Sequence, residues 1–307
     1  MIICCGEALI DFLPRPLAEG GEGFQPVSGG AIFNTALALG RLGAQVGLLA
    51  GVSEDMFGQK ILADLQKSGV STEYLCRMSK PSTLAFVQLV DGQAQYTFMD
   101  ENSAMRGLNE AMLPTLPDPL EALHFGGISL ISEPCGSAYE ALMRRESERC
   151  VISFDPNIRT GFITDHDSHR ARIARMLALS DIVKVSDEDL AWIAPNTPTE
   201  TAIRAILQQG ASIVLLTKGA EGIVAYSHDF DVHVQAQKVA VVDTIGAGDT
   251  FNAGFLYGLK RQDCLERSLR WLSAETFHDA IEFANQVAAV TVSRAGANSP
   301  WLHELKK

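Results

Sequence analysis

The segment from Asp243 to Phe251 carries residue types that can bind and transfer a phosphoryl group. Gly246, Ala247 and Gly248 have no bulky side chains, so their amide N–H groups can approach an anion closely. A helical pattern of apolar residues follows from Phe251. The first amides of a helix are unpaired and lie at the positive end of its dipole. We therefore expect a phosphate-binding anion hole at residues 246–248.

Asp249 falls in the first turn of this helix, beside the expected anion hole. A carboxylate there can accept the proton of an attacking hydroxyl while the amides stabilise the charge on the phosphoryl oxygens. The alternative is that Asp249 only favours the helix dipole and that the glycines only form a turn. Two glycines flanked by acids at 243 and 249 favour the catalytic interpretation, with Asp249 as the base.

A second segment, Ser28–Ala36, combines Gly29 and Gly30 with Asn34 in the first turn of a predicted helix. Paired glycines let the backbone approach a ligand, and the Asn34 amide can both donate to and accept from hydroxyl groups. The spacing does not match a dinucleotide-binding G-x-G-x-x-G sequence, and the chain has no G-x-x-x-x-G-K-[ST] loop. This segment is a candidate for binding hydroxyl groups.

The elements that position these residues follow an α/β rhythm. Short apolar runs at 2–5, 151–154, 182–185 and 213–216 each end at glycine or polar residues. Helical patterns cover 31–42, 55–68 and 276–294, the first two followed by Gly43 and Gly69, and a strand-like run at 239–242 precedes Asp243. Strands that alternate with helices predict a mostly parallel sheet with its ligand at the carboxyl ends of the strands.

Residues 83–100 break this rhythm and predict a β-hairpin around Asp91-Gly92. Counting outward from that turn pairs Val87 with Tyr96 and Ala85 with Phe98. A two-stranded ribbon needs a partner to be stable, so we expect it to lie with residues 14–28 as a small β lid over the ligand edge. The alternative is an ordinary edge hairpin.

The composition limits the classes of partner. The chain has 307 residues, 47% hydrophobic and 20% charged, with a formal net charge of -12. That charge argues against binding to nucleic acid or to an anionic membrane. No apolar run approaches the roughly 18 residues of a membrane span, and the first residues do not read as a signal peptide. The six scattered cysteines include no C-x-x-C pair, which indicates reduced thiols in the cytoplasm.

Taken together, these segments resemble the ribokinase-like (PfkB) family of carbohydrate kinases over essentially the whole chain. Both family signatures occur in order: Gly29-Gly30…Asn34 continuing through Gly40–Gly43 and Gly51…Asp55…Gly58, and then Asp243–Asp249. Three further segments look most like bacterial fructokinases: Gly6–Asp11, Asp155–Arg159 and Lys184–Asp189. The resemblance implies a three-layer Rossmann-like fold, with a core of residues 1–13, 29–82 and 101–307 and a β lid of residues 14–28 and 83–100.

The resemblance also implies roles for single residues. Asp249 is the expected base, with the amides of Gly246, Ala247 and Gly248 as the anion hole. The sugar is expected to contact Asp11, Gly29, Gly30, Asn34 and Arg159, with Tyr96, Phe98 and Arg106 as candidates for discriminating between sugars. The ATP site is expected to include Lys184, Ser186, Thr217, Gly219, Gly222 and Asn285.

Metal ions are implied at two places. Asp243 and the carbonyl groups of Ile245 and Gly296 match the place where many relatives hold a monovalent cation, usually K⁺. The family's N-x-x-E motif, associated with Mg²⁺, is replaced here by Ser186-x-x-Asp189. A shorter carboxylate can still order Mg²⁺ through water, but Ser-x-x-Asp is also a capping box at a helix start, and both interpretations stay open.

The expected activity is transfer of the γ-phosphoryl group of ATP to a small sugar, with D-fructose to fructose 6-phosphate favoured by resemblance. 2-Keto-3-deoxygluconate, ribose or a nucleoside would use the same machinery. A sugar-binding regulator without catalysis is an alternative from another class, and a nicotinamide-dependent oxidoreductase is disfavoured by the missing G-x-G-x-x-G. The expected partners are the sugar and ATP, with a second copy of the chain contacting the β lid.

Overall fold

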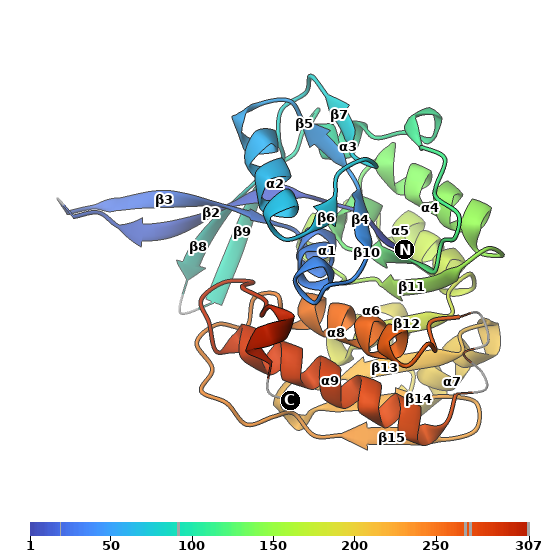
Figure 1. Ribbon diagram of the computed structural model, residues 1–307. Helices are drawn as coiled ribbons and strands as arrows, with labels where there is room; N and C mark the ends of the chain where they lie inside the picture. The colour runs from blue at the N-terminus through green and yellow to red at the C-terminus, as the bar shows by residue number, and fades with distance from the viewer. Residues whose placement is uncertain (19, 91–92, 267–268, 270–271, 306–307) are drawn as a thin grey trace.

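The computed structural model describes residues 1–18, 20–90, 93–266, 269 and 272–305. Within these residues a nine-stranded sheet runs through the centre of the molecule (Figure 1). Its strands, in order across the sheet, are β15 (Asp231–Val234), β14 (Ile223–Tyr226), β13 (Ile213–Thr217), β12 (Ile182–Ser186), β11 (Val151–Asp155), β10 (Ala122–Gly126), β1 (Ile2–Cys5), β4 (Val46–Leu49) and β6 (Val70–Ser71). The pairs from β13 to β6 are parallel, and β14 and β15 are added antiparallel at one edge.

Helices cover both faces of this sheet because successive strand residues point to opposite sides. In β1, Ile2 and Cys4 belong to one hydrophobic cluster, and Ile3 and Cys5 belong to the other. The first cluster includes α1 (Ala31–Arg41), α2 (Met56–Lys67), α8 (Ala247–Arg261) and α9 (Ala274–Val292). The second includes α4 (Cys135–Glu146), α5 (His166–Leu177), α6 (Asp187–Ile193) and α7 (Thr199–Gln209). The predicted three-layer α/β fold is confirmed.

The shorter elements connect these layers. They are β5 (Gly51–Ser53) paired with β7 (Cys76–Met78), α3 (Ala104–Gly107), and the 3₁₀ turns η1 (Glu110–Met112), η2 (Ile128–Leu130), η3 (Thr160–Phe162), η4 (Gly219–Glu221) and η6 (Leu302–Glu304). The glycines predicted to end the first two helices adopt left-handed backbone conformations, with φ of 88° at Gly43 and 76° at Gly69. The last long helix begins at Ala274, two residues earlier than predicted, because Ser273 caps its first turn.

A separate four-stranded sheet projects from one side of the α/β body (Figure 1). Its strands, in order, are β3 (Glu22–Gly29), β2 (Leu9–Pro16), β8 (Leu84–Val90) and β9 (Gln93–Met99). Val87 is opposite Tyr96 and Ala85 is opposite Phe98, as the hairpin register predicted. The predicted turn at residues 91–92 lies outside the described residues. β2 begins at Leu9, so residues 9–13 belong to this sheet as well.

The prediction of a strand at residues 239–242 is wrong. These residues are irregular, and Val239, Val241 and Val242 are exposed. The amides of Val242 and Asp243 instead donate to the carbonyl oxygen of Val292 at the end of α9. A run of valines favours a strand only where a neighbouring strand is available, and β15 ends the sheet on this side.

Two features bear on the surroundings of the protein. None of the helices in the described ranges combines the length and apolar character that crossing a lipid bilayer requires. All six cysteines are unpaired, and Cys4, Cys5, Cys135 and Cys150 are buried. These four buried thiols therefore act as small apolar groups in the core.

Candidate active site

A cavity of about 450 Å³ lies where the carboxyl ends of β11, β12 and β13 meet the starts of α1 and α8. Fourteen of the residues predicted from the sequence line it: Asp11, Gly30, Asn34, Phe98, Arg159, Lys184, Ser186, Asp189, Thr217, Ile245, Gly246, Ala247, Gly248 and Asp249. Residues separated by more than 200 positions in the chain thus share one cavity. The position at the carboxyl ends of parallel strands is the one that the α/β pattern predicted.

The start of α8 presents backbone amides to this cavity. Gly246 precedes the helix in a left-handed conformation, with φ of 77°, and no side chain caps the first turn. A Cβ atom at Gly246 would lie 2.5 Å from Cβ of Ala297, so only glycine fits there. The amide of Ala247 donates to the carbonyl oxygen of Thr244 at 3.3 Å. The uncapped helix start can bind an anion. The Ala247 amide, one of the three predicted donors, is however already hydrogen-bonded within the turn.

Asp249 is 8% exposed and faces the cavity from the first turn of α8. Its Oδ2 accepts a hydrogen bond of 2.9 Å from Nδ2 of Asn34, an uncharged partner. Burial raises the pKa of Asp249 to about 7; the hydrogen bond from Asn34 and the charge of Lys184 oppose this, and the charge of Asp155 adds to it. A carboxyl group with a pKa near neutrality is suited to accept a proton from a substrate hydroxyl.

Asn34 reaches Asp249 because α1 begins at the glycine pair. The N-terminal cap position is Gly30, with φ of 107° and no capping side chain of its own. Glu7, at the carboxyl end of β1, fills this role: its Oε1 accepts from the amide of Ala31 at 2.9 Å, and its Oε2 accepts from the amide of Ser129 at 3.3 Å. Glu7 is buried and lines the cavity. No local sequence pattern predicts this capping role for Glu7, because its partners lie in distant segments of the chain.

Asp11 projects from β2 into the same cavity. Burial raises the pKa of Asp11 to about 7. A Cβ atom at Gly29 would lie 2.1 Å from Oδ2 of Asp11, so Gly29 leaves the space that this carboxyl group occupies. Gly29 itself lines a neighbouring cavity of about 360 Å³, which Asp11 and Asn34 also line. Gly29 is not among the residues that line the cavity holding Asp249, and it bears on that cavity through Asp11.

The predicted ATP-site residues divide into two groups. Lys184, Ser186 and Thr217 line the cavity at the ends of β12 and β13. Gly219 is the first residue of η4 and Gly222 follows its end, where a Cβ atom at Gly222 would lie 2.2 Å from the carbonyl oxygen of Val234. Asn285 is buried on α9 and donates to the carbonyl oxygen of Gln235 at 3.2 Å. The structure does not bring Gly219, Gly222 or Asn285 into the cavity that holds Asp249.

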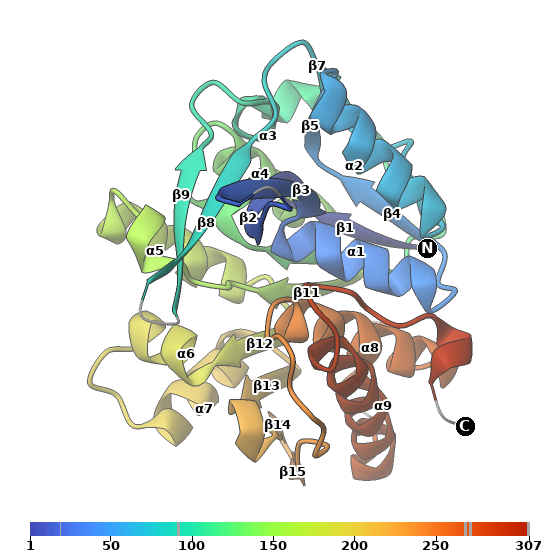
Figure 2. The ribbon, with the colours of Figure 1, turned by 90° about the vertical axis from the view of Figure 1, so that its left-hand side faces the viewer.

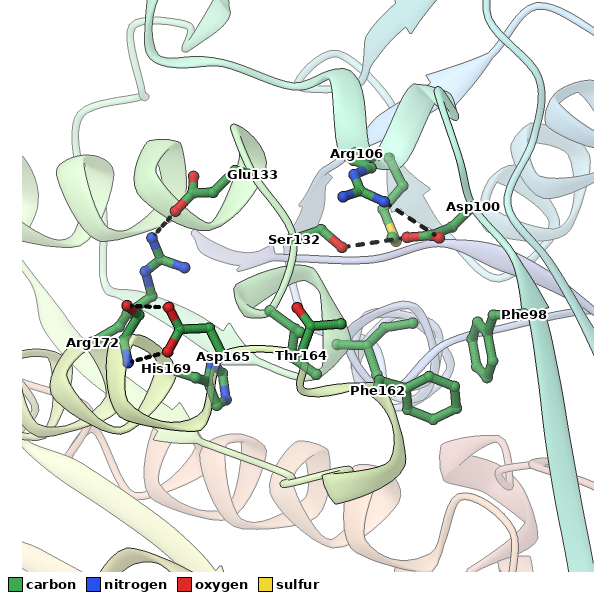
Figure 3. Close-up of a pocket in the computed structure, with 14 residues that line it drawn as sticks. Phe98, Asp100, Arg106, Ser132, Glu133, Phe162, Thr164, Asp165, His169 and Arg172 are labelled. Carbon is green, nitrogen blue, oxygen red and sulfur yellow. Dashed lines mark hydrogen bonds and ion pairs between the residues drawn. The ribbon is translucent and has the colours of Figure 1, made fainter.

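Two of the residues expected to discriminate between sugars, Phe98 and Arg106, line a second cavity of about 440 Å³, drawn in Figure 3. Phe98 of β9 and Phe162 of η3 line both cavities, and their ring centroids are 4.3 Å apart. Figure 3 shows this pair at one end and Arg172 at the other. Arg106 lines the second cavity and not the first, and its guanidinium nitrogen is 3.7 Å from Oδ1 of Asp100. The side chain of Tyr96 lies outside the described residues.

Phe162 lines both cavities, although no sequence pattern predicted it. It is the last residue of the 3₁₀ turn η3, and no spacing rule marks a single aromatic residue in so short a turn. Its ring packs against Phe98 of the small sheet, so this pair connects that sheet to the α/β body across the cavity. Aromatic pairs of this kind stabilise a contact by roughly 0.5–1.5 kcal/mol beyond the area they bury.

The carboxylate of Asp189 is fully engaged within the protein. Its Oδ2 accepts from the amide of Ser186 at 3.0 Å and from the Ser186 hydroxyl at 2.7 Å. Its Oδ1 accepts from the amide of Ile158 at 2.8 Å. The Ser186 hydroxyl accepts in turn from the Asp189 amide, which completes a capping box at the start of α6. These contacts do not fit Asp189 as a direct Mg²⁺ ligand.

Asp243 joins the two loops that were assigned to a monovalent cation. Its Oδ1 accepts from the amide of Ile245 at 3.0 Å, and its Oδ2 accepts from the amide of Gly296 at 2.8 Å. Ile245 and Gly296 line the cavity of about 360 Å³. Their backbones are therefore held together, as a cation site built from carbonyl oxygens requires. In the part of the chain that the structure describes, no group of three His, Cys, Asp or Glu side chains could hold a metal ion.

Comparison with known proteins gives a consistent result. Residues 1–304 match the profile described as "pfkB family carbohydrate kinase". A fructokinase of Rhizobium leguminosarum bv. trifolii is 53% identical over 267 residues, which is 87% of this chain and 82% of that protein. A fructokinase of Vibrio alginolyticus is 30% identical over 295 residues, covering 95% of this chain and 92% of that protein.

Solved structures agree with the sequence relatives. Fructokinase from Xylella fastidiosa with bound ATP superposes with a TM-score of 0.88 at 29% identity, covering 96% of this chain and 93% of that one. Fructokinase from Vibrio cholerae O395 in fructose, ADP and calcium ion bound form has a TM-score of 0.85 at 27% identity, with coverage of 96% and 94%.

Proposed function

This chain belongs to the pfkB family of carbohydrate kinases, and we propose that it transfers the terminal phosphoryl group of ATP to D-fructose, giving fructose 6-phosphate. The observation that carries this proposal is the pairing, in one cavity, of the buried Asp249 carboxyl group with the uncapped start of α8. Fructokinases at 53% and 30% identity, and fructokinase structures with ATP or with fructose and ADP, support ATP and fructose as the substrates.

In the proposed mechanism Asp249 accepts the proton of the primary hydroxyl as that oxygen attacks the terminal phosphorus of ATP. The bond from phosphorus to the bridging oxygen of ATP breaks, and ADP leaves with the electron pair. The amides at the start of α8 stabilise the charge on the transferring phosphoryl oxygens. Asn34 holds the Asp249 carboxyl group in place through its hydrogen bond.

The sugar is proposed to lie between the start of α1 and the small sheet. Asp11 and Asn34 would bind hydroxyl groups, Arg159 would lie near the sugar or the transferring phosphate, and Phe98 would pack against the ring. The small sheet acts as a lid in this proposal: Phe98 and Phe162, which are in contact and line both cavities, would cover the sugar on the side of the second cavity. Excluding water prevents water from accepting the phosphoryl group in place of the sugar.

Mg²⁺ is proposed to accompany ATP, where it would neutralise phosphate charge. Because Asp189 is engaged in its capping box, we assign Mg²⁺ to the nucleotide phosphates and water and not to direct ligation by Asp189. K⁺ is proposed at the loops that Asp243 joins, with carbonyl oxygens of Ile245 and Gly296 as ligands. There it would stabilise the backbone that leads into the anion hole.

A second copy of the chain is proposed to contact the outer face of the lid. Phe12, Phe24 and Phe86 form an aromatic cluster there: the rings of Phe12 and Phe86 stack with centroids 4.7 Å apart, and Phe24 is 48% exposed. An exposed aromatic cluster on an edge sheet favours a protein partner. Six unpaired thiols support a location in the cytoplasm.

The test of the proposed function is release of ADP from ATP and Mg²⁺ with a panel of acceptors, with and without K⁺. We expect fructose to give the highest kcat/KM, above ribose and 2-keto-3-deoxygluconate. Tight fructose binding without ADP release would identify a sugar-binding regulator instead. The oligomeric state is tested by sedimentation of the wild type and of Phe24→Ser, which we expect to shift the protein toward the monomer.

A further inference from the structure

A buried ion pair between Lys184 and Asp155 lies next to the candidate anion hole. Nζ of Lys184 in β12 is 2.7 Å from Oδ2 of Asp155 at the end of β11, and the two residues are 6% and 3% exposed. Nδ2 of Asn252, on α8, donates to the same Oδ2 at 2.7 Å. β11 and β12 end beside the start of α8 (Figure 2). Removing charges from water is costly, so such a pair is weak evidence for stability and invites a functional explanation.

The two partners differ in their access to the cavity. Lys184 lines it, and a Cβ atom at Gly248 would lie 3.3 Å from Nζ of Lys184. The ammonium group is therefore adjacent to the amides that we assign to phosphate. Asp155 lies behind Lys184 and is not among the residues that line the cavity.

Lys184 is the partner that balances the charge of Asp155. His124, on β10, is also close enough for its charge to affect Asp155. Burial, however, lowers the pKa of His124 to about 4, so its ring is neutral at neutral pH. Its Nδ1 is 3.0 Å from the Ser153 hydroxyl. The Lys184 ammonium is thus drawn toward Asp155, with Asn252 fixing the direction of the carboxylate.

We propose that Asp155 is a positioning residue which, together with Asn252, holds the Lys184 ammonium at the anion hole so that it binds the transferring phosphoryl group. This inference rests on the proposed function. Lysine has a flexible four-carbon chain, and fixing it before ATP binds removes an entropic cost from the step in which phosphoryl charge develops. Asp155 itself touches neither substrate and acts through Lys184.

The test is a double-mutant cycle of Asp155→Asn and Lys184→Met, measured by ADP release. Each single variant is expected to lower kcat by about 10- to 100-fold while leaving KM for fructose within about threefold. The double variant is expected to be no worse than Lys184→Met alone, because Asp155 has no function without the lysine. Additive losses in the double variant, or an Asp155→Asn enzyme with wild-type kcat, would overturn the inference.

Two further variants separate positioning from stability. Asn252→Ala keeps both charges but removes the second donor to Asp155, so we expect a several-fold lower kcat with unchanged KM for fructose. If Asp155→Asn does not fold, Asn252→Ala provides the test of positioning in its place. The matched control is Glu121→Gln, which removes the carboxylate paired with Lys260 at the opposite, amino end of the strands. It is expected to keep wild-type kcat.

The outcomes for the function and for this inference are distinct. A wild-type protein that releases no ADP with any sugar would overturn the proposed function. An active wild type whose Asp155→Asn variant loses only melting temperature, with kcat unchanged, would overturn the positioning role alone.

Discussion

Lowering the pH from about 8 to about 5 is expected to inactivate the enzyme through Asp249, because the base must be ionised to accept a proton. Burial raises the pKa of Asp249 to about 7. At one pH unit below that value roughly one Asp249 side chain in ten is ionised, so kcat/KM falls roughly tenfold from its plateau. An aspartate at the ordinary value of 3.8 would show almost no loss over this range.

The assay measures kcat and kcat/KM with fructose from coupled ADP release across this pH range, at saturating ATP and Mg²⁺. Asn34→Ala removes the hydrogen bond that opposes the effect of burial, so it is expected to raise the pKa of Asp249 and move the acidic limb to higher pH. Asp11 needs a separate control because burial also raises its pKa to about 7. Asp11→Asn is expected to raise KM for fructose while the limb in kcat stays in place.

Two results would refute this reasoning. A profile that stays flat down to about pH 5 would show that no group with a pKa near 7 must be ionised for turnover. A limb that disappears in Asp11→Asn and persists unchanged in Asn34→Ala would assign the titration to Asp11, and Asp249 would then not be the base.

Three substitutions test other parts of the site. Asp249→Asn is expected to lower kcat by roughly 10² or more with fructose affinity within a few-fold, measured by ADP release and by equilibrium binding; near-wild-type turnover would contradict its role as base. Gly29→Ala places a Cβ atom 2.1 Å from Oδ2 of Asp11, so KM for fructose should rise more than kcat falls; an unchanged KM would argue against Asp11 as a sugar ligand. Asp189→Ala removes the capping box with Ser186, so the free energy of unfolding measured by urea titration should fall by about 1 kcal/mol. The Mg²⁺ concentration for half-maximal activity should stay constant. A large rise in that concentration would indicate that Asp189 is a metal ligand.

Patterns that repeat locally were sufficient to predict most of the fold. The hairpin register followed from the position of its two-residue turn, since pairing in an antiparallel ribbon is fixed by counting outward from the turn. The run of valines at 239–242 has the same local character as a strand, yet no neighbouring strand is available to it. Strand formation depends on partners that the local sequence does not reveal.

The same distinction, between local patterns and contacts with distant segments, applies to the residues of the candidate site. The glycines and Asp249 could be predicted because helix starts and close backbone approach demand particular residue types at fixed spacing. Glu7 could not, because its contacts with Ala31 and Ser129 arise only when β1, α1 and η2 meet in space. An acidic residue at the end of a buried strand was the one available signal, and it does not say which helix the residue will cap.

The bridge that Asp243 makes between Ile245 and Gly296 has a consequence for synthesis of the protein. Gly296 follows Asp243 by 53 residues. While translation is in progress, the nascent polypeptide already contains Asp249 and the glycines around it, but it lacks the loop against which Gly246 packs. A polypeptide released before residue 296 would hold the Asp249 carboxylate in an unsupported turn, so we expect the candidate base to reach its final position only after residue 296 has been translated.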